Sequence, residues 1–227
     1  MLTILPSVPR AVLRVKFPAI ASFYQKMAKG AVAADSDELL NLTIKCIGVV
    51  LCAQEHTKAV WTKPSTMRLF NILVHCLSNP SDDVSDTAGE PMKEVLSMHA
   101  AAGLKVVAVH VASVAEQAVN ACKSQDCTST LKLLDFLQKV AGFMPVEALT
   151  KPSEPLMRLP SLGHAGLAKM SMRTMDAVMQ SPMHNTEPGH DNSEQVSFFV
   201  VQFLTGLLDL QPSALHSDAD PAATFSS

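Results

Sequence analysis

The stretch LVHCLSNPSDDVSDTAGEPMKEVLS (residues 73–97) decides the fold, because it contains the end of one helical pattern, a short turn and the start of another. The first pattern runs into the turn at 78–81, where Pro80 pushes the residue before it out of the helical region. Ser81 is suited to cap the following helix, and the two aspartates after it suit that helix's positive end. The stretch therefore predicts two antiparallel helices joined by a short turn.

The second helical pattern of this stretch contains Gly89 and Pro91, two residues that are unusual inside a helix. Proline lacks an N–H group and collides with the carbonyl one turn earlier, so we expect this helix to kink. A kinked outer helix would allow a stack of hairpins to curve. A kink without such a purpose is equally compatible with the sequence.

A helix with a narrow polar stripe and an apolar remainder recurs along the chain. The segment 36–54, which Ser36 can cap, shows this pattern most clearly. Its polar stripe consists of Asn41, Lys45, Gly48, Cys52 and Glu55. A helix that is apolar over most of its circumference must be covered on several sides, so we expect it to lie between neighbouring helices.

The remaining helical patterns define the fold class. They cover residues 10–29 with a kink at Pro18, 65–77, 104–123, 130–140, a short segment from Pro145, 161–180 and 196–210. The connections are mostly short, so consecutive helices should pack antiparallel, and no segment alternates as a strand does. The hairpins begin near residues 65, 104 and 145, a period of about 40 residues that is typical of HEAT repeats. The sequence predicts an all-α fold, an α-solenoid of HEAT-type antiparallel helical hairpins.

The chain divides by composition into repeats and a polar C-terminal part. We expect HEAT-type helical repeats over residues 1–180, a polar loop at 181–194, a terminal helix of the same array at 195–210 and a disordered tail at 211–227. Solenoids usually close with a polar capping repeat, whereas the segment 196–210 is strongly apolar. We therefore expect this chain to be a piece of a longer solenoid or the product of a truncated gene.

The charge balance argues against a general nucleic-acid binder. The net charge is −3, and only 17% of the residues are charged. Nucleic-acid binding draws most of its energy from lysine and arginine, so it would need a local basic patch. The best candidate for contact with RNA or an acidic partner is the N-terminal helical segment, with its basic residues Arg10, Arg14, Lys16, Lys26 and Lys29.

Two other interpretations of this basic segment remain open. The five basic side chains could form a solvated helix face that binds nothing. No acidic residue precedes Asp35, so the segment could also be a mitochondrial presequence, although its three prolines suit that role poorly.

The chain lacks the common signatures of catalysis and cofactor binding. It contains no phosphate-binding loop, no dinucleotide fingerprint, no zinc-protease helix and no nucleophile elbow. The small-residue segment 163–166 is interpreted as helix punctuation instead of a phosphate loop. No apolar run is long enough to span a membrane. We expect a protein that is not an enzyme and that has no catalytic residues and no cofactor.

The five cysteines predict free thiols in a reducing compartment. Cys46, Cys52 and Cys76 fall in apolar helical patterns, as buried thiols do. Cys122 and Cys127 have loose metal-ligand spacing, but no second pair completes a zinc site. We expect neither a structural metal nor a native disulfide.

The order and spacing of the helices resemble the HEAT repeats of the ribosomal-RNA-processing protein twelve family, which are large karyopherin-like nucleolar proteins. The resemblance starts at VPRAVLRVKFPAIASFYQKMAKG (8–30) and continues through LLNLTIKCIGVVL (39–51) and TMRLFNILVHCLSNPSDDVSDTAGEPMKEVL (66–96). It is clearest at TSTLKLLDFLQKVAGFMPVEALTKPSEPLMRL (128–159) and weakens after about residue 180. These are helix-packing patterns, so the resemblance carries over no functional residue.

The resemblance implies a scaffold in ribosomal RNA processing and in the assembly and export of small ribosomal subunits. It implies a nuclear, nucleolar location and the following partners: ribosome-assembly factors, precursor ribosomal RNA, and the remaining repeats of a longer chain. A generic protein-interaction scaffold or nuclear transport adaptor is the main alternative. A mitochondrial helical protein is a further alternative, and an α-helical enzyme is the last.

Overall fold

The hairpin that the stretch 73–97 predicts is present. The computed structural model describes residues 5–180, and in it α5 (Pro64–Leu77) packs against α6 (Asp82–Ala101) across the turn 78–81. Ser81 is the N-cap residue of α6, but its hydroxyl caps nothing. Instead, the Asn79 side-chain carbonyl accepts a hydrogen bond from the Ser81 N–H at 2.9 Å. The predicted position of the cap is confirmed, and the predicted capping hydroxyl is wrong because the asparagine side chain organises this turn.

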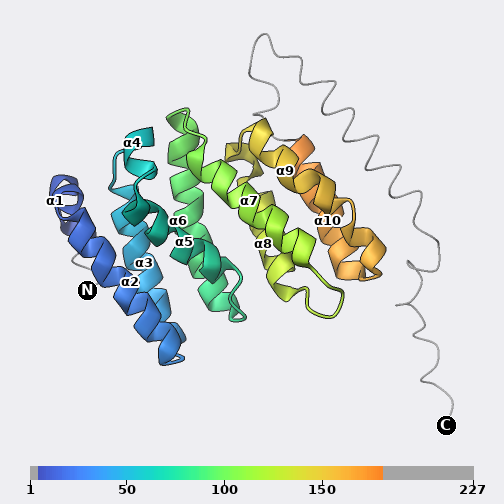
Figure 1. The fold of residues 1–227 in the computed structure, drawn as a ribbon, viewed down its shortest axis with the longest axis horizontal. Coiled ribbons are helices and arrows are strands. Elements are labelled where there is room, and N and C mark those ends of the chain that lie inside the picture. Colours follow the sequence, from blue (N-terminus) through green and yellow to red (C-terminus); the bar gives the residue numbers. More distant parts are fainter. Residues whose placement is uncertain (1–4, 181–227) are drawn as a thin grey trace.

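Three further helical hairpins complete an array in which no described residue belongs to a strand. They are α2 (Phe17–Ala33) with α3 (Asp37–Cys52), α7 (Val106–Ala121) with α8 (Thr128–Val140), and α9 (Val146–Leu156) with α10 (Ala165–Met179). The first helices of successive hairpins contact each other from α2 to α5 and from α7 to α9. The second helices contact each other from α3 through α6 and α8 to α10. The hairpins follow one another along the longest axis in chain order (Figure 1), which confirms the predicted all-α solenoid.

Short elements join and flank the hairpins. The elements are η1 (Leu5–Ser7), α1 (Arg10–Val15), α4 (Lys58–Trp61), η2 (Ala141–Phe143) and η3 (Leu159–Leu162). The helix predicted over residues 10–29 is in fact two helices that separate at Lys16. Pro18 lies in the first turn of α2, where a missing N–H group costs nothing, so it starts a helix instead of kinking one.

Side chains cap the N-terminal ends of two other helices, α3 and α10. The Ser36 hydroxyl accepts a hydrogen bond from the Leu39 N–H at 3.3 Å and caps α3, as predicted. Gly163 has a φ of 71° and ends η3, and the Nδ1 atom of His164 then accepts the Leu167 N–H at 3.2 Å and caps α10. The segment 163–166 is therefore helix punctuation, as its small residues indicated.

The core is aliphatic, and one contact in it explains the unusual residues of α6. Gly48 of α3 is buried, and a Cβ atom placed on it would lie 2.5 Å from the Cβ of Pro91 in α6. Gly48 therefore belongs to a helix–helix contact, and its predicted place in the polar stripe of this helix is wrong. α6 continues through Pro91 as one helix, so the proline ring packs against α3 inside an unbroken element. Gly89 faces Phe136 of α8 and Leu77 of α5 at ordinary contact distance.

Polar contacts between hairpins repeat at the period of the array. Arg14 contacts Glu55, Asn41 contacts Asp83, Asn71 contacts His110, and Lys105 contacts Glu147. The separations along the chain are 41, 42, 39 and 42 residues. Each contact therefore joins nearly equivalent positions of neighbouring structural units, which supports the period deduced from the sequence. The predicted polar loop (181–194), terminal helix (195–210) and tail (211–227) lie outside the described residues.

Candidate functional site

The five predicted basic residues lie on α1, on α2 and at the junction between these helices. The Arg14 Nε donates to the Ala53 carbonyl at 2.8 Å, and its Nη1 pairs with the Glu55 carboxylate at 3.2 Å. Arg14 therefore ties α1 to the end of α3. Arg10 lines a groove beside α3, and only Lys16 lies at the junction of α1 and α2. The other two members of the set, Lys26 and Lys29, lie in the C-terminal half of α2. Lys26 and Lys29 are therefore separated from the basic residues of α1 by the first half of α2.

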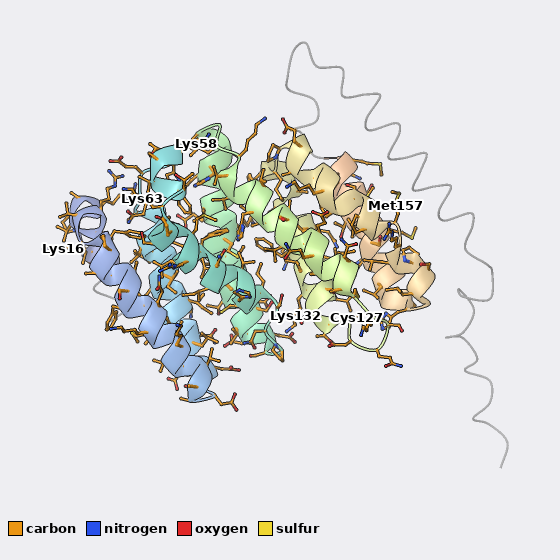
Figure 2. The ribbon with its side chains drawn as sticks, in the orientation of Figure 1. Lys16, Lys58, Lys63, Cys127, Lys132 and Met157 are labelled. Atoms are coloured by element: carbon orange, nitrogen blue, oxygen red, sulfur yellow. The ribbon has the colours of Figure 1, made fainter. Side chains whose placement is uncertain are left out.

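Two lysines that the sequence reasoning missed lie near the same end of the array as Lys16. Lys58 begins α4, and Lys63 immediately precedes α5. Figure 2 shows Lys16, Lys58 and Lys63 toward the N-terminal end of the array, and all three are exposed. None of the three forms an ion pair with another residue of the 5–180 region. We call these three lysines the basic edge.

A small hollow lies beside Lys63, one of the three lysines of the basic edge. It measures about 310 Å³ and lies between the α1–α2 junction and the first turn of α5. Its lining includes Lys63, Ser65 and Thr66 from the start of α5, together with Arg14 and its partner Glu55. The Arg14–Glu55 pair is internally neutral, so Lys63 supplies the uncompensated positive charge in the lining of the hollow. The only sequence signal for this surface was the pair of lysines in the short segment KAVWTK (58–63).

Two larger open grooves flank α6 on the second layer of helices. One, of about 1060 Å³, lies between α3 and α6, and the other, of about 840 Å³, lies between α6 and α8. Both grooves are bordered by Asp86, Glu90 and Lys93. The lining mixes acidic, basic and apolar side chains. An open surface of this composition resembles the polar rim and apolar patches of protein interfaces more than an enclosed small-molecule pocket.

A buried aromatic cluster joins the end of α3, α4 and α6. The rings of His99 and Trp61 meet edge to face with centroids 4.3 Å apart, and His56 contacts both. Burial and the neighbouring His56 lower the pKa of His99 to about 4, and burial also lowers the pKa of His56. These histidines are absent from the lining of the three hollows described above, so their position suits packing more than acid–base catalysis.

The cysteine, histidine, aspartate and glutamate side chains are the potential metal ligands of the described region. Among residues 5–180, no group of three or more histidine, cysteine, aspartate or glutamate side chains could hold a metal ion. His75 and Cys76 point to different environments, since the histidine is exposed and the cysteine is buried. Cys127 contacts His164 with a Sγ–Nε2 distance of 3.5 Å. In the region that the structure covers, no helix is long and apolar enough to cross a membrane.

Comparison with known proteins gives one distant similarity. No family model matches the chain. The chain is 20% identical over 215 residues to the RRP12-like protein of Homo sapiens. The matched region is 92% of this chain but only 16% of the length of the human protein. The comparison supports a distant relationship between this chain and part of the RRP12-like protein.

Proposed function

We propose that this chain is part of a helical scaffold that has no active site. The scaffold acts in ribosome assembly, where it takes part in ribosomal RNA processing and in formation of the small subunit. The single observation that carries the proposal is the similarity to the RRP12-like protein over 92% of the chain. The array of hairpins supports it, because stacked helical repeats present extended surfaces for macromolecules. The nucleus and nucleolus are the corresponding location, and ribosome-assembly factors are the corresponding protein partners.

Contact with precursor ribosomal RNA would use the basic edge. Lys16, Lys58 and Lys63 are exposed and form no ion pair with a described residue, so binding a phosphate would break no existing pair. Three lysines neutralise few phosphates, so the affinity should be modest and should fall as the salt concentration rises. Arg14 contributes to this surface indirectly, by holding α1 against α3 through Ala53 and Glu55.

The test compares a triple and a double set of glutamine substitutions in the full-length protein. The first variant carries Lys16→Gln, Lys58→Gln and Lys63→Gln. The control carries Lys26→Gln and Lys29→Gln, which remove exposed lysines from the distant half of α2. Sedimentation of cell extract through a sucrose gradient should show the control in the fractions of precursor small subunits. The first variant should shift toward the top of the gradient, more strongly at higher salt.

Two outcomes separate the parts of the proposal. Equal co-sedimentation of both variants with precursor small subunits would remove the basic edge from the RNA-binding hypothesis. A protein that never co-sediments with these particles, substituted or not, would remove the ribosome-assembly function. The grooves that flank α6 favour the second candidate function, a protein-interaction scaffold or transport adaptor, which would then be preferred.

A further inference from the structure

Two cysteines, Cys122 and Cys127, flank the loop between α7 and α8. The loop closes tightly, because the Asp126 N–H donates to the Lys123 carbonyl at 3.1 Å and these two residues form an isolated antiparallel bridge. Cys122 and Cys127 are the next residues outward on each side of this bridge. Cys127 has helical backbone angles as the N-cap residue of α8, so the bridge itself does not extend to this pair, but the closed turn brings the two ends of the loop toward each other. Their proximity is also apparent from the electrostatic influence of Cys122 on Cys127.

A histidine from the following hairpin reaches one of these thiols. The Nε2 atom of His164 lies 3.5 Å from the Cys127 Sγ. The Nδ1 atom of the same ring accepts the Leu167 N–H at 3.2 Å, so a neutral ring carries its proton on Nε2. That proton points toward the sulfur and would stabilise negative charge as it develops there. Cys127 is also the N-cap residue of α8, where the helix dipole acts in the same direction.

The two thiols differ in access to solvent. Cys122 is half-buried beside the exposed loop 123–126, whereas Cys127 is buried. Burial raises the pKa of Cys127, so this residue is a protonated thiol at neutral pH. A small oxidant therefore reaches Cys122 first, and Cys127 lies in position to react second.

We infer that Cys122 and Cys127 form an oxidation site, at which a peroxide converts the two thiols into a disulfide. In the first step the Cys122 sulfur attacks hydrogen peroxide, which forms Cys122 sulfenic acid and releases water. In the second step the Cys127 sulfur attacks the Cys122 sulfur, the S–O bond breaks, and the departing hydroxide leaves as water with the Cys127 proton. Two electrons pass from the thiols to the peroxide. The disulfide joins the end of α7 to the start of α8 and removes the Cys127 contact from His164, the residue that caps α10.

The other cysteines provide internal controls for this site. Burial raises the pKa of Cys52 to about 12 and that of Cys76 to about 11, so both remain protonated at neutral pH. Cys46 is buried in α3. These thiols should survive a peroxide treatment that oxidises the pair in the α7–α8 loop.

The experiment treats the folded whole protein with hydrogen peroxide, blocks the remaining thiols after unfolding and digests the protein with trypsin. Trypsin cleaves after Lys105, Lys123 and Lys132, so Cys122 and Cys127 fall in separate peptides, 106–123 and 124–132. The expected product is these two peptides joined, with the mass of two hydrogen atoms lost, while Cys46 and Cys76 remain alkylated. Absence of the joined pair in protein that circular dichroism shows to be folded would overturn the inference.

Two variants test the order of the steps and the part played by His164. Cys127→Ser should leave Cys122 as a sulfenic acid that dimedone traps, whereas a failure to trap it there would contradict the inference. His164→Asn keeps an oxygen that can cap α10 but removes the ring N–H beside Cys127. It should slow disulfide formation about tenfold, the change that corresponds to losing one hydrogen bond to a charged group. An unchanged rate would exclude His164 as a positioning residue.

Discussion

Gly48 is a residue of close approach between α3 and α6. A Cβ on Gly48 would lie 2.5 Å from the Cβ and 3.2 Å from the Cγ of Pro91. The proline ring is rigid, so neither helix can accommodate an added methyl group without moving. Gly48 and Pro91 thus form a close contact between neighbouring hairpins.

Gly48→Ala should therefore destabilise the protein by about 1–3 kcal/mol, the usual cost of overpacking. Urea unfolding followed by circular dichroism measures this change. Gly30→Ala is the matched control, because a Cβ at that helical position meets nothing within 4 Å. The control should stabilise the protein slightly, since alanine is the better helix former. Equal stabilities for the two variants would show that the α3–α6 contact is not tight.

His99 makes the core sensitive to acid. Both ring nitrogens are buried without a hydrogen-bond partner, and burial with the nearby His56 lowers the pKa to about 4. The unfolded chain binds this proton with a pKa of about 6.5. Between these two pKa values the unfolded state holds more protons, so the free energy of unfolding decreases as the pH falls. The lowered pKa values of His56 and His110 act in the same direction.

His99→Leu should reduce this acid sensitivity by up to about 1.4 kcal/mol per pH unit between pH 6.5 and 4. At pH 7 the variant should be at least as stable as the original protein, because it removes buried polar atoms that have no partner. Urea unfolding at several pH values measures both effects. An unchanged dependence of stability on pH would show that His99 does not titrate in the core.

At the scale of elements, Lys132 of α8 anchors the turn between α5 and α6. Its Nζ donates to the carbonyls of Asn79 at 2.7 Å and Pro80 at 2.8 Å and pairs with the Asp82 carboxylate at 2.8 Å. The lysine side chain is only 14% exposed. Ser129 adds a hydrogen bond to the Ser78 carbonyl at 3.2 Å. The turn 78–81 is therefore held by the next hairpin.

Lys132→Met should destabilise the protein by about 1–3 kcal/mol, because it removes hydrogen bonds from a charged donor to two carbonyls. Lys139→Met is the control on the same helix. Its ion pair with Asp135 is 2.7 Å long, but the lysine is 56% exposed, and such pairs contribute at most about 1 kcal/mol. Thermal unfolding of both variants measures the difference. Similar losses would mean that Lys132 is no more than a surface ion pair.

At the scale of the whole molecule, the array is held together by contacts between neighbouring units. The recurring contacts join residues separated by 39 to 42 positions, so each hairpin depends on the hairpin before or after it. We therefore expect the array to fold without a metal or a crosslink, and we expect the oxidation site to be an addition to a structure that folds in its reduced form.

Chelation should accordingly leave the melting temperature of the whole protein unchanged. A structural metal contributes directly to folding, so its removal would lower that temperature by several degrees. Differential scanning calorimetry with and without a strong chelator provides the measurement. A clear decrease would mean that the chain binds a metal through ligands outside the described residues or through a set that the sequence reasoning rejected.

The sequence by itself determined most of the helices, the place of the hairpin turn and the period of the array. These features depend on local chemistry: Ser36 caps α3, Pro80 prevents α5 from continuing, and polar stripes mark the helix faces. The N-terminal basic segment could be recognised as charged, but the sequence did not show that Arg14 is paired with Glu55. The part played by Gly48 was also misjudged, because a glycine in a polar stripe gives no sign of the ring that faces it.

Only the tertiary structure decided which residues of different hairpins meet. Lys16 shares one end of the array with Lys58 and Lys63, and Cys127 meets His164 across 37 positions of chain. The rotation and offset of one packed hairpin against the next set these contacts, and both depend on the side chains of the two hairpins together. Helix formation is local and can be deduced from a segment, whereas the sites of this molecule lie between segments.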